Sequence, residues 1–170
     1  MRAHVDALTK LRALVIERRN GDDADLDRAI AIVCEALSAP LGKILELNPA
    51  GDALFVRAGY GWDEGLAESV LVSSAVTSVA GYSLAHRGAV LFNDVQGTKR
   101  FTDAGLLRSY GVTATLAVRL DLAGGRRGVL SVHERTTRRF TAAEATFVEQ
   151  AAMIISGRSD ATVQRRREEQ

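Results

Sequence analysis

The amino-acid sequence predicts an α+β fold, in which an antiparallel sheet is combined with helices at both ends of the chain. Apolar residues recur at helical spacing near both ends of the 170 residues. The interior holds short runs of strand composition separated by turn-forming residues. The resulting order is helix, helix, two strands, a mixed middle, two strands and a helix. Strands that follow one another directly pair as antiparallel hairpins, which distinguishes this order from a doubly wound α/β fold.

Two helices are expected before the first strand. Within residues 2–18, a 3–4 spacing relates the apolar residues Val5, Leu8, Leu11, Leu14 and Val15. The polar run at residues 19–23 ends this helix, and Asp22 or Asp23 can cap the next one. The second helix is expected to continue to the break at Pro40. Its apolar face consists of Leu26, Ile30, Val33 and Leu37.

Two hairpins are expected to form most of the sheet. Residues 43–47 and 53–62 are joined by the turn-forming run NPAGD. The clearest strands, residues 112–120 and 128–134, are joined by AGGRRG. Each pair is short-linked and therefore antiparallel.

The middle segment and the last helix complete the order. The middle is expected to hold a short strand, two short helices and an extended piece, at residues 68–72, 77–87, 103–110 and 89–94 respectively. The last helix has the clearest start signal, because Thr141 and Glu144 match a capping box and Phe140 stands just before the cap. Its apolar face consists of Phe147, Val148, Ala151, Ile154 and Ile155.

Composition excludes several classes of protein. The formal net charge of +1 gives no strong attraction to nucleic acid or to an acidic membrane, so neither is an expected partner. No apolar run approaches the roughly 20 residues of a membrane helix. The single cysteine, Cys34, excludes an internal disulfide and favours a reducing, cytoplasmic location. Its place beside Ile30 and Leu37 predicts a small buried thiol.

Residues 24–156 contain an ordered set of segments that runs GKILELNPAGDALFVRAGYGW, SVAGYSLAHRGAVLFNDV, RF, GVTATLAVRL, GVLSVHE and FTAAE. This set resembles the GAF domain. It is most similar to GAF domains of bacterial sensor histidine kinases and cyclic-di-GMP signalling proteins. The resemblance implies a central six-stranded antiparallel sheet with the terminal helices on one face, often joined across a homodimer. It also implies a small-molecule pocket between the other face and the middle segment.

The resemblance divides the chain into three parts. Residues 1–20 would form a linker or dimerisation helix, residues 21–157 the GAF-like domain, and residues 158–170 a polar tail or the start of an output helix. The function that it implies is sensory: a small effector binds and the terminal helices pass a change to a histidine kinase or cyclase domain, in the same chain or another. A ligand-free dimerisation module is the structural alternative.

Seven residues are candidates for contact with a ligand. Tyr82 and His86 share a face of the short helix at residues 77–87. Tyr60 and Trp62 would alternate to one face of their strand, where aromatic rings can stack on a planar ligand. Thr115, Ser131 and His133 would give the last two strands their more polar face. For each set the alternative is ordinary core or sheet-edge packing.

The predicted dimer would use an apolar side left over on the first helix, together with the last helix. Its candidate contacts are Val5, Leu8, Leu11, Val15, Val148 and Ile155. A monomer whose first helix folds back fully on its own sheet is the alternative.

No catalytic constellation occurs in the sequence, so an enzyme is not expected. The histidines His4, His86 and His133 do not have the spacing of a zinc site, and no metal is expected. Among GAF subtypes, the cyclic-GMP signature is not matched, no cysteine is placed for bilin attachment, and one histidine is weak support for haem. A GAF-type free methionine sulfoxide reductase is the enzymatic alternative, although one cysteine cannot form the internal disulfide of that cycle.

Overall fold

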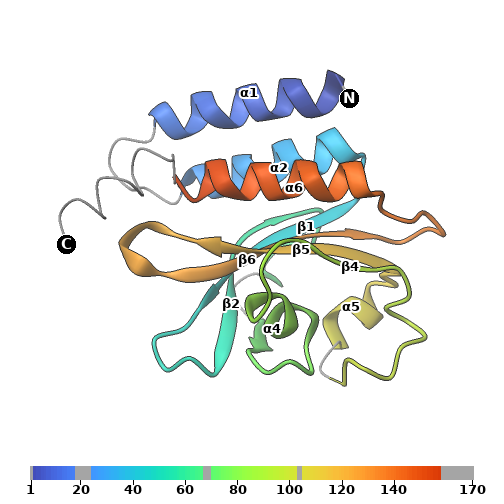
Figure 1. The fold of residues 1–170 in the computed structure, drawn as a ribbon. Coiled ribbons are helices and arrows are strands. Elements are labelled where there is room, and N and C mark those ends of the chain that lie inside the picture. Colours follow the sequence, from blue (N-terminus) through green and yellow to red (C-terminus); the bar gives the residue numbers. More distant parts are fainter. Residues whose placement is uncertain (1, 18–23, 67–69, 103–104, 158–170) are drawn as a thin grey trace.

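The computed structural model describes residues 2–17, 24–66, 70–102 and 105–157 (Figure 1). Its helices are α1 (Arg2–Glu17), α2 (Ala24–Leu37), α4 (Val79–Leu84), α5 (Gly105–Ser109) and α6 (Ala142–Ile155). Its strands are β1 (Leu41–Leu47), β2 (Ala53–Tyr60), β3 (Leu71–Ser73), β4 (Val90–Phe92), β5 (Ala114–Asp121) and β6 (Arg127–Glu134). The predicted α+β class is confirmed.

All six strands form one antiparallel sheet in the order β3-β2-β1-β6-β5-β4. The two predicted hairpins therefore meet along β1 and β6, which lie at the centre of the sheet. Central strands have neighbours on both sides, and here they are also covered on both faces, so nearly every residue of β1 and β6 is buried. A polar side chain on either strand is thus held inside the protein.

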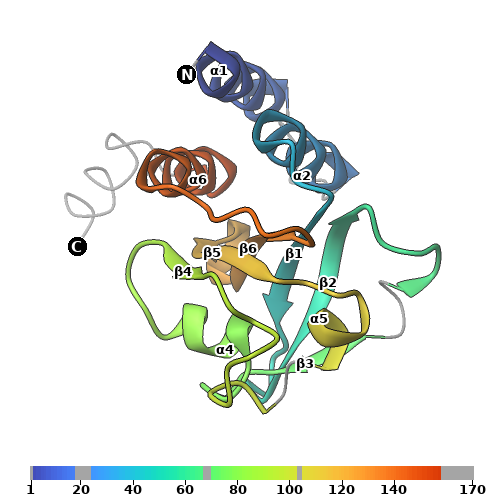
Figure 2. The ribbon, with the colours of Figure 1, turned by 90° about the vertical axis from the view of Figure 1, so that its right-hand side faces the viewer.

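The helices α2 and α6 cover one face of the sheet, and α1 lies across them as an outer layer (Figures 1 and 2). The capping box at the start of α6 forms as predicted: Thr141 Oγ1 accepts from the Glu144 amide at 3.1 Å, and Glu144 Oε1 accepts from the Thr141 amide at 3.0 Å. Phe147, Val148 and Ala151 then point into the largest apolar cluster, which lies between the helices and the sheet.

The prediction that α1 leaves an apolar side free for a partner is wrong for two of its residues. Leu8 and Leu11 are buried within the chain, since the face of α1 that carries them rests on α2 and α6. Val148 and Ile155 are buried in the same cluster. Val5 remains 62% exposed, and the side chain of Val15 lies outside the described residues. The first helix therefore folds back on its own domain, against the other two helices rather than against the sheet.

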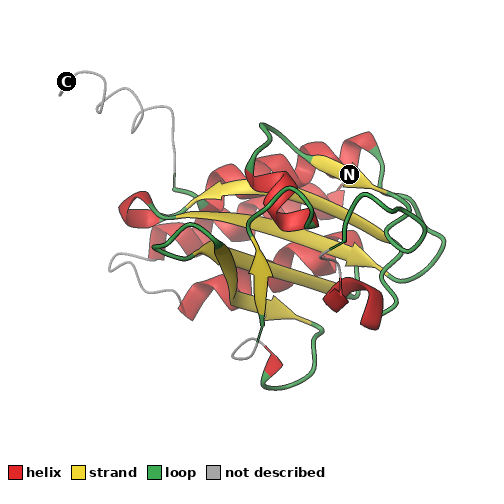
Figure 3. Ribbon diagram, turned by 90° about the horizontal axis from the view of Figure 1, so that it is seen from below, coloured by secondary structure: helices red, strands yellow, loops and turns green. Residues whose placement is uncertain are grey.

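The segment between β3 and β5 covers the other face of the sheet, with α4 and α5 nearest the viewer in Figure 3. Ser78 caps α4, because its Oγ accepts from the Gly81 amide at 2.9 Å. Helix α4 ends at Leu84 and is shorter than predicted, and Gly88 adopts a φ of 76° in the turn that follows.

A bulge in β2 shifts the alternation of its side chains. Ile44 pairs with Ala58 while Leu45 pairs with Val56, so one extra residue, Arg57, stands between the two pairs. Before the bulge, Leu54 and Val56 face α4; after it, Ala58 and Tyr60 pack on the helix side. Such a shift exchanges the two faces of a strand.

Candidate functional site

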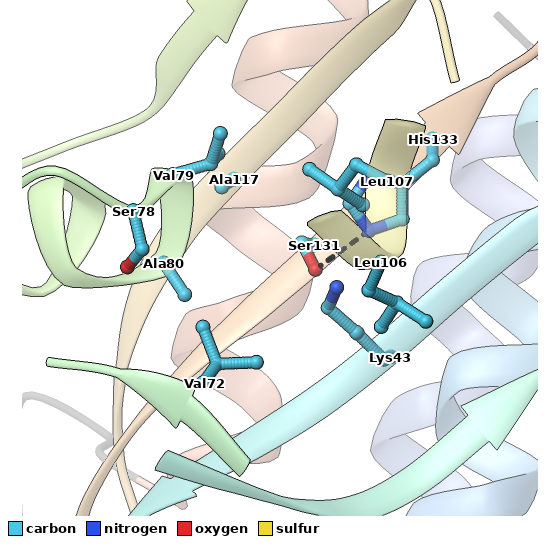
Figure 4. Close-up of a pocket in the computed structure, with 10 residues that line it drawn as sticks. All are labelled: Lys43, Val72, Ser78, Val79, Ala80, Leu106, Leu107, Ala117, Ser131 and His133. Atoms are coloured by element: carbon cyan, nitrogen blue, oxygen red, sulfur yellow. Dashed lines mark hydrogen bonds between the residues drawn. The ribbon is translucent and has the colours of Figure 1, made fainter. Parts of the chain in front are cut away.

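Two pockets that share Lys43 and Leu106 lie between the sheet and the segment that holds α4 and α5, and we call them the inner and the outer part of one cavity. The inner part has a volume of about 20 Å³, which is room for about one water molecule. The outer part has a volume of about 170 Å³. The inner part is otherwise lined by Val72, Ser78, Val79, Ala80, Leu107, Ala117, Ser131 and His133 (Figure 4). The outer part is otherwise lined by Asp27, Val56, Gly59, Gly61, Trp62, Asp63, Gly65 and Leu66.

Lys43 is the most unusual residue of the cavity. It is 4% exposed and stands on the central strand β1, opposite Ser131 of β6. Its Nζ lies 5.2 Å from the centroid of the Trp62 ring. It forms no hydrogen bond and no ion pair with any of the residues that the structure describes. Burial therefore lowers the pKa of Lys43 from 10.5 to about 7.

His133 lies beside Lys43 and is held by two hydroxyl groups. Thr115 Oγ1 is 2.8 Å from its Nδ1, and Ser131 Oγ is 3.1 Å from its Nε2. Burial, and next the positive charge of Lys43, hold the pKa of His133 well below 6.5. The imidazole is therefore neutral near pH 7, and it donates one of these hydrogen bonds and accepts the other.

Trp62 forms the wall between the sheet and the outer part of the cavity. Gly61, with a φ of 84°, turns the chain back after β2, and Trp62 Nε1 donates to the Gly42 carbonyl at 2.7 Å. The Tyr110 ring packs edge-on against the indole, with 4.8 Å between centroids. The Tyr110 hydroxyl in turn donates to Asp63 at 2.6 Å. These contacts fix the indole at the side of Lys43.

The structure brings four of the seven predicted residues to this site. Trp62, Ser131 and His133 line the cavity. Thr115 forms a hydrogen bond with His133. Whether they bind a ligand stays a prediction. They converge because Thr115, Ser131 and His133 occupy the same face of neighbouring strands, as their alternation indicates.

The other three predicted residues, Tyr60, Tyr82 and His86, are not among the described residues that line the cavity. Tyr60 packs on the helix side, because the bulge in β2 reverses its face. Tyr82 packs against Phe92 and Phe101, and His86 stacks on Tyr82 with 3.9 Å between ring centroids.

Sequence reasoning missed Lys43, although a signal was present. Lys43 shares one face of β1 with Leu41, Leu45 and Leu47, and that face is otherwise apolar. A lysine on such a face is normally explained by an edge strand, where the amine reaches water. Only the position of β1 at the centre of the sheet turns this lysine into a buried one.

Cys34 lies far from this chemistry. It is buried in the cluster between the helices and the sheet, as predicted, whereas Lys43 faces the other side. Burial raises the pKa of the Cys34 thiol. Among the described residues, no group of three or more histidine, cysteine, aspartate or glutamate side chains could hold a metal ion.

The arrangement is suited to binding. The inner part of the cavity offers an amine, a hydroxyl and an imidazole on neighbouring strands of the sheet (Figure 4). The outer part adds apolar side chains together with the carboxylates of Asp27 and Asp63. Pockets with a few convergent polar groups and an otherwise apolar lining are typical of small-molecule sites.

Comparison with known proteins agrees with this architecture. The family model of the GAF domain matches residues 23–158. No curated protein sequence matches the chain. Within the described part of the chain, none of the helices has the length and hydropathy needed to cross a membrane.

Solved structures share the fold at low sequence identity. The GAF domain of a phosphoenolpyruvate-protein phosphotransferase from Coxiella burnetii is 14% identical, with a TM-score of 0.78 over 97% of this chain and 96% of that one. A free methionine-R-sulfoxide reductase from Neisseria meningitidis, solved with its substrate, is 20% identical, with a TM-score of 0.75 over 96% and 93%. A domain of a protein assigned as a two-component sensor histidine kinase from Sinorhizobium meliloti 1021 is 16% identical, with a TM-score of 0.61 over 88% and 96%.

Proposed function

Because the chain belongs to the GAF domain family, which comprises sensory and regulatory domains, we propose that it binds a small-molecule effector in the cavity at Lys43. The observation that carries the proposal is the buried amine of Lys43, which has no hydrogen-bond or ion-pair partner among the described residues. A buried charge without a partner destabilises a fold. Such groups are therefore strong candidates for functional sites.

The sheet itself offers a route from the cavity to the helices. Lys43, Ser131 and His133 face the cavity, while their strand neighbours Ile44, Leu130 and Val132 belong to the cluster beneath α2 and α6. A ligand that favours one packing of this cluster shifts the balance between two arrangements of the helices. A coupling free energy of about 1–3 kcal/mol is enough for regulation.

The output of this domain is proposed to be a histidine kinase or cyclase domain, in the same chain or in another. The similarity to a sensor histidine kinase domain and to a chemotaxis protein supports a signalling role. We propose a cytoplasmic location, for which the single cysteine is the support. A homodimer is also proposed, and its contact would be the outer side of α1 and α6, where Val5 and Met153 are 62% and 57% exposed.

A panel of small metabolites tests ligand binding through the melting temperature of the protein. Leu106 lines both parts of the cavity, so Leu106→Trp should fill it. Leu91→Trp is the matched control, because Leu91 is 38% exposed on β4 and does not line either part. A compound that stabilises the wild type and the control, but not Leu106→Trp, would support the proposal.

The same compound should slow amide hydrogen exchange in α1 and α6 if the signal reaches the helices. If no compound in the panel acts through the cavity and no small molecule co-purifies with the protein, the ligand-free dimerisation module becomes the better explanation.

The enzymatic alternative is reduction of free methionine sulfoxide. The similarity to two such reductases in fold favours it. The position of Cys34 opposes it, because a buried thiol with a raised pKa on the far side of the sheet cannot attack a sulfoxide in the cavity. An assay of thioredoxin-dependent reduction, with Cys34→Ala as the control, decides this point.

A further inference from the structure

We infer that the effector carries one negatively charged group, a carboxylate, that pairs with Lys43 Nζ where the inner and outer parts of the cavity meet, and an apolar body that lies along Trp62, Val56 and Leu106. This inference rests on the proposed function, and it specifies the chemical class of the ligand.

Lys43 lacks a counter-charge among the residues that the structure describes. Lys43 is 4% exposed, and none of the described residues forms an ion pair with it. Natural proteins pair their buried charges or bind ligands with them. A carboxylate at Nζ would supply the partner that the protein does not.

The polar groups near Lys43 Nζ are suited to an anion. Ser131 pairs with Lys43 across the two central strands, and His133 lies close enough for the Lys43 charge to lower its pKa (Figure 4). In the tautomer in which His133 Nε2 donates to Ser131 Oγ, the Ser131 hydroxyl keeps its proton and can donate it to an anion beside the amine. None of the described residues that line the inner part carries a carboxylate, so none of them opposes a negative group.

Two carboxylates, those of Asp27 and Asp63, lie in the wall of the outer part. Asp27 Oδ1 accepts from the Gly59 amide at 3.2 Å, and Asp63 Oδ2 accepts from the Tyr110 hydroxyl at 2.6 Å. These two carboxylates would repel a second negative charge on the ligand. The charges therefore favour a ligand with a single anionic group, directed inward.

The size of the outer part suits a small apolar body. The outer part measures about 170 Å³, and an apolar protein cavity of about 150 Å³ is known to hold benzene. Its wall carries the apolar side chains of Val56, Trp62, Leu66 and Leu106. A body of about six non-hydrogen atoms fits this space on the same comparison.

Binding of such an anion is coupled to a proton. The pKa of Lys43 is about 7, so the amine is largely neutral at pH 8. Among the groups that face it, His133 is neutral, while Asp27 and Asp63 lie in the outer wall and accept hydrogen bonds. A carboxylate stabilises the ammonium form, so its binding at pH 8 should take up a proton and its affinity should fall as pH rises above about 7.

Benzoate and its uncharged amide, benzamide, test the inference as matched probes. The protein contains three lysines, Lys10, Lys43 and Lys99, so labelling lysine with ¹³C gives a spectrum in which the Lys43 side chain can be followed. Benzoate should shift the Lys43 resonance and raise its pKa, and should bind at least about tenfold more tightly than benzamide. Lys43→Met should abolish this tenfold preference, whereas Lys99→Met, at an exposed position, should keep it.

With these probes, the inference would be overturned by equal affinity for benzoate and benzamide, by unchanged benzoate affinity in a folded Lys43→Met protein, or by no shift of the Lys43 resonance at about 10 mM benzoate. A neutral metabolite that binds the cavity irrespective of Lys43→Met would overturn the inference and leave the proposed sensory function standing. A failure of every compound to act through the cavity would remove both.

Discussion

The Cys34 thiol lies against the backbone of Gly42, in the space that a side chain at residue 42 would occupy. A Cβ atom on Gly42 would overlap Cys34 Sγ and would lie 3.0 Å from Ile30 Cδ1. Helix α2 therefore approaches β1 closely because residue 42 is a glycine. This contact lies directly behind Lys43 on the opposite face of the sheet.

Gly42→Ala should destabilise the protein by about 1–3 kcal/mol, as overpacking of a closely packed core does. Removing the sulfur with Cys34→Ala should make the same change less costly, with a coupling of about 0.5–3 kcal/mol in a double-mutant cycle of urea unfolding. Gly105→Ala is the control, because a Cβ at that position meets nothing within 4 Å. Strict additivity of the two substitutions would contradict the predicted contact.

Cys34 should resist thiol reagents in the native protein. Its side chain is fully buried, and burial raises its pKa, so little thiolate is accessible. Labelling with an aromatic disulfide should be slow in buffer and fast in denaturant, as followed by absorbance. Rapid native labelling would show that α2 separates from the sheet.

Lys43→Met should stabilise the protein at pH 7, because it replaces a buried amine with an apolar side chain of similar length. The pKa of Lys43 is about 7 in the folded protein, against 10.5 for a lysine exposed to water, as in the unfolded chain. The unfolded chain therefore binds more protons between these values, and the stability of the wild type should rise with pH across this window. The slope approaches about 1.4 kcal/mol per pH unit.

The comparison with Lys43→Met isolates this effect, since other groups that titrate in the same window are shared by both proteins. Urea unfolding at several pH values between 7 and 10 measures it. Parallel stability curves for the two proteins would mean that Lys43 keeps its ordinary pKa and that its amine reaches water.

Leu11→Ala should cost about 2–5 kcal/mol in the free energy of unfolding, because Leu11 is fully buried between helices. Val5→Glu is the matched change on the exposed side of α1 and should alter stability by less than about 0.5 kcal/mol. If the proposed homodimer forms, Val5→Glu should dissociate it, and the sedimentation coefficient should fall. A dimer with a dissociation constant of about 1 μM would form at protein concentrations of about tens of micromolar. A wild type that is monomeric at that concentration would exclude the proposed dimer.

Most elements of the fold could be predicted from the sequence because their signals are local. The capping box at Thr141, the spacing on α2 and the turn residues of both hairpins each depend on a few neighbouring positions. The layer in which α1 lies could not be predicted in this way. Its apolar face fits a sheet, a partner or other helices equally well, and only the packing of α2 and α6 decides.

The candidate site could be predicted only where strand alternation is regular. Ser131 and His133 follow it. The bulge at Arg57 places Tyr60 on the helix side of the sheet, and the turn at Gly61 brings Trp62 back to the cavity. Lys43 was missed for a different reason, since its burial depends on the order of strands in the sheet. Strand order joins segments that are distant in sequence, and no local pattern records it.

Because α1 lies outside the other two helices, separating it from the domain costs less free energy than unfolding the whole domain. Its principal contacts are with α2 and α6, and those two helices cover the face of the sheet that lies beneath α1 (Figure 2). Undocking α1 would therefore expose one side of two helices and leave the sheet and the Lys43 cavity covered. The free energy of that step is only the part of the total stability that one helical face contributes. A domain built in this way can change the position of its first helix without unfolding, so a second state lies within reach of a weakly coupled ligand.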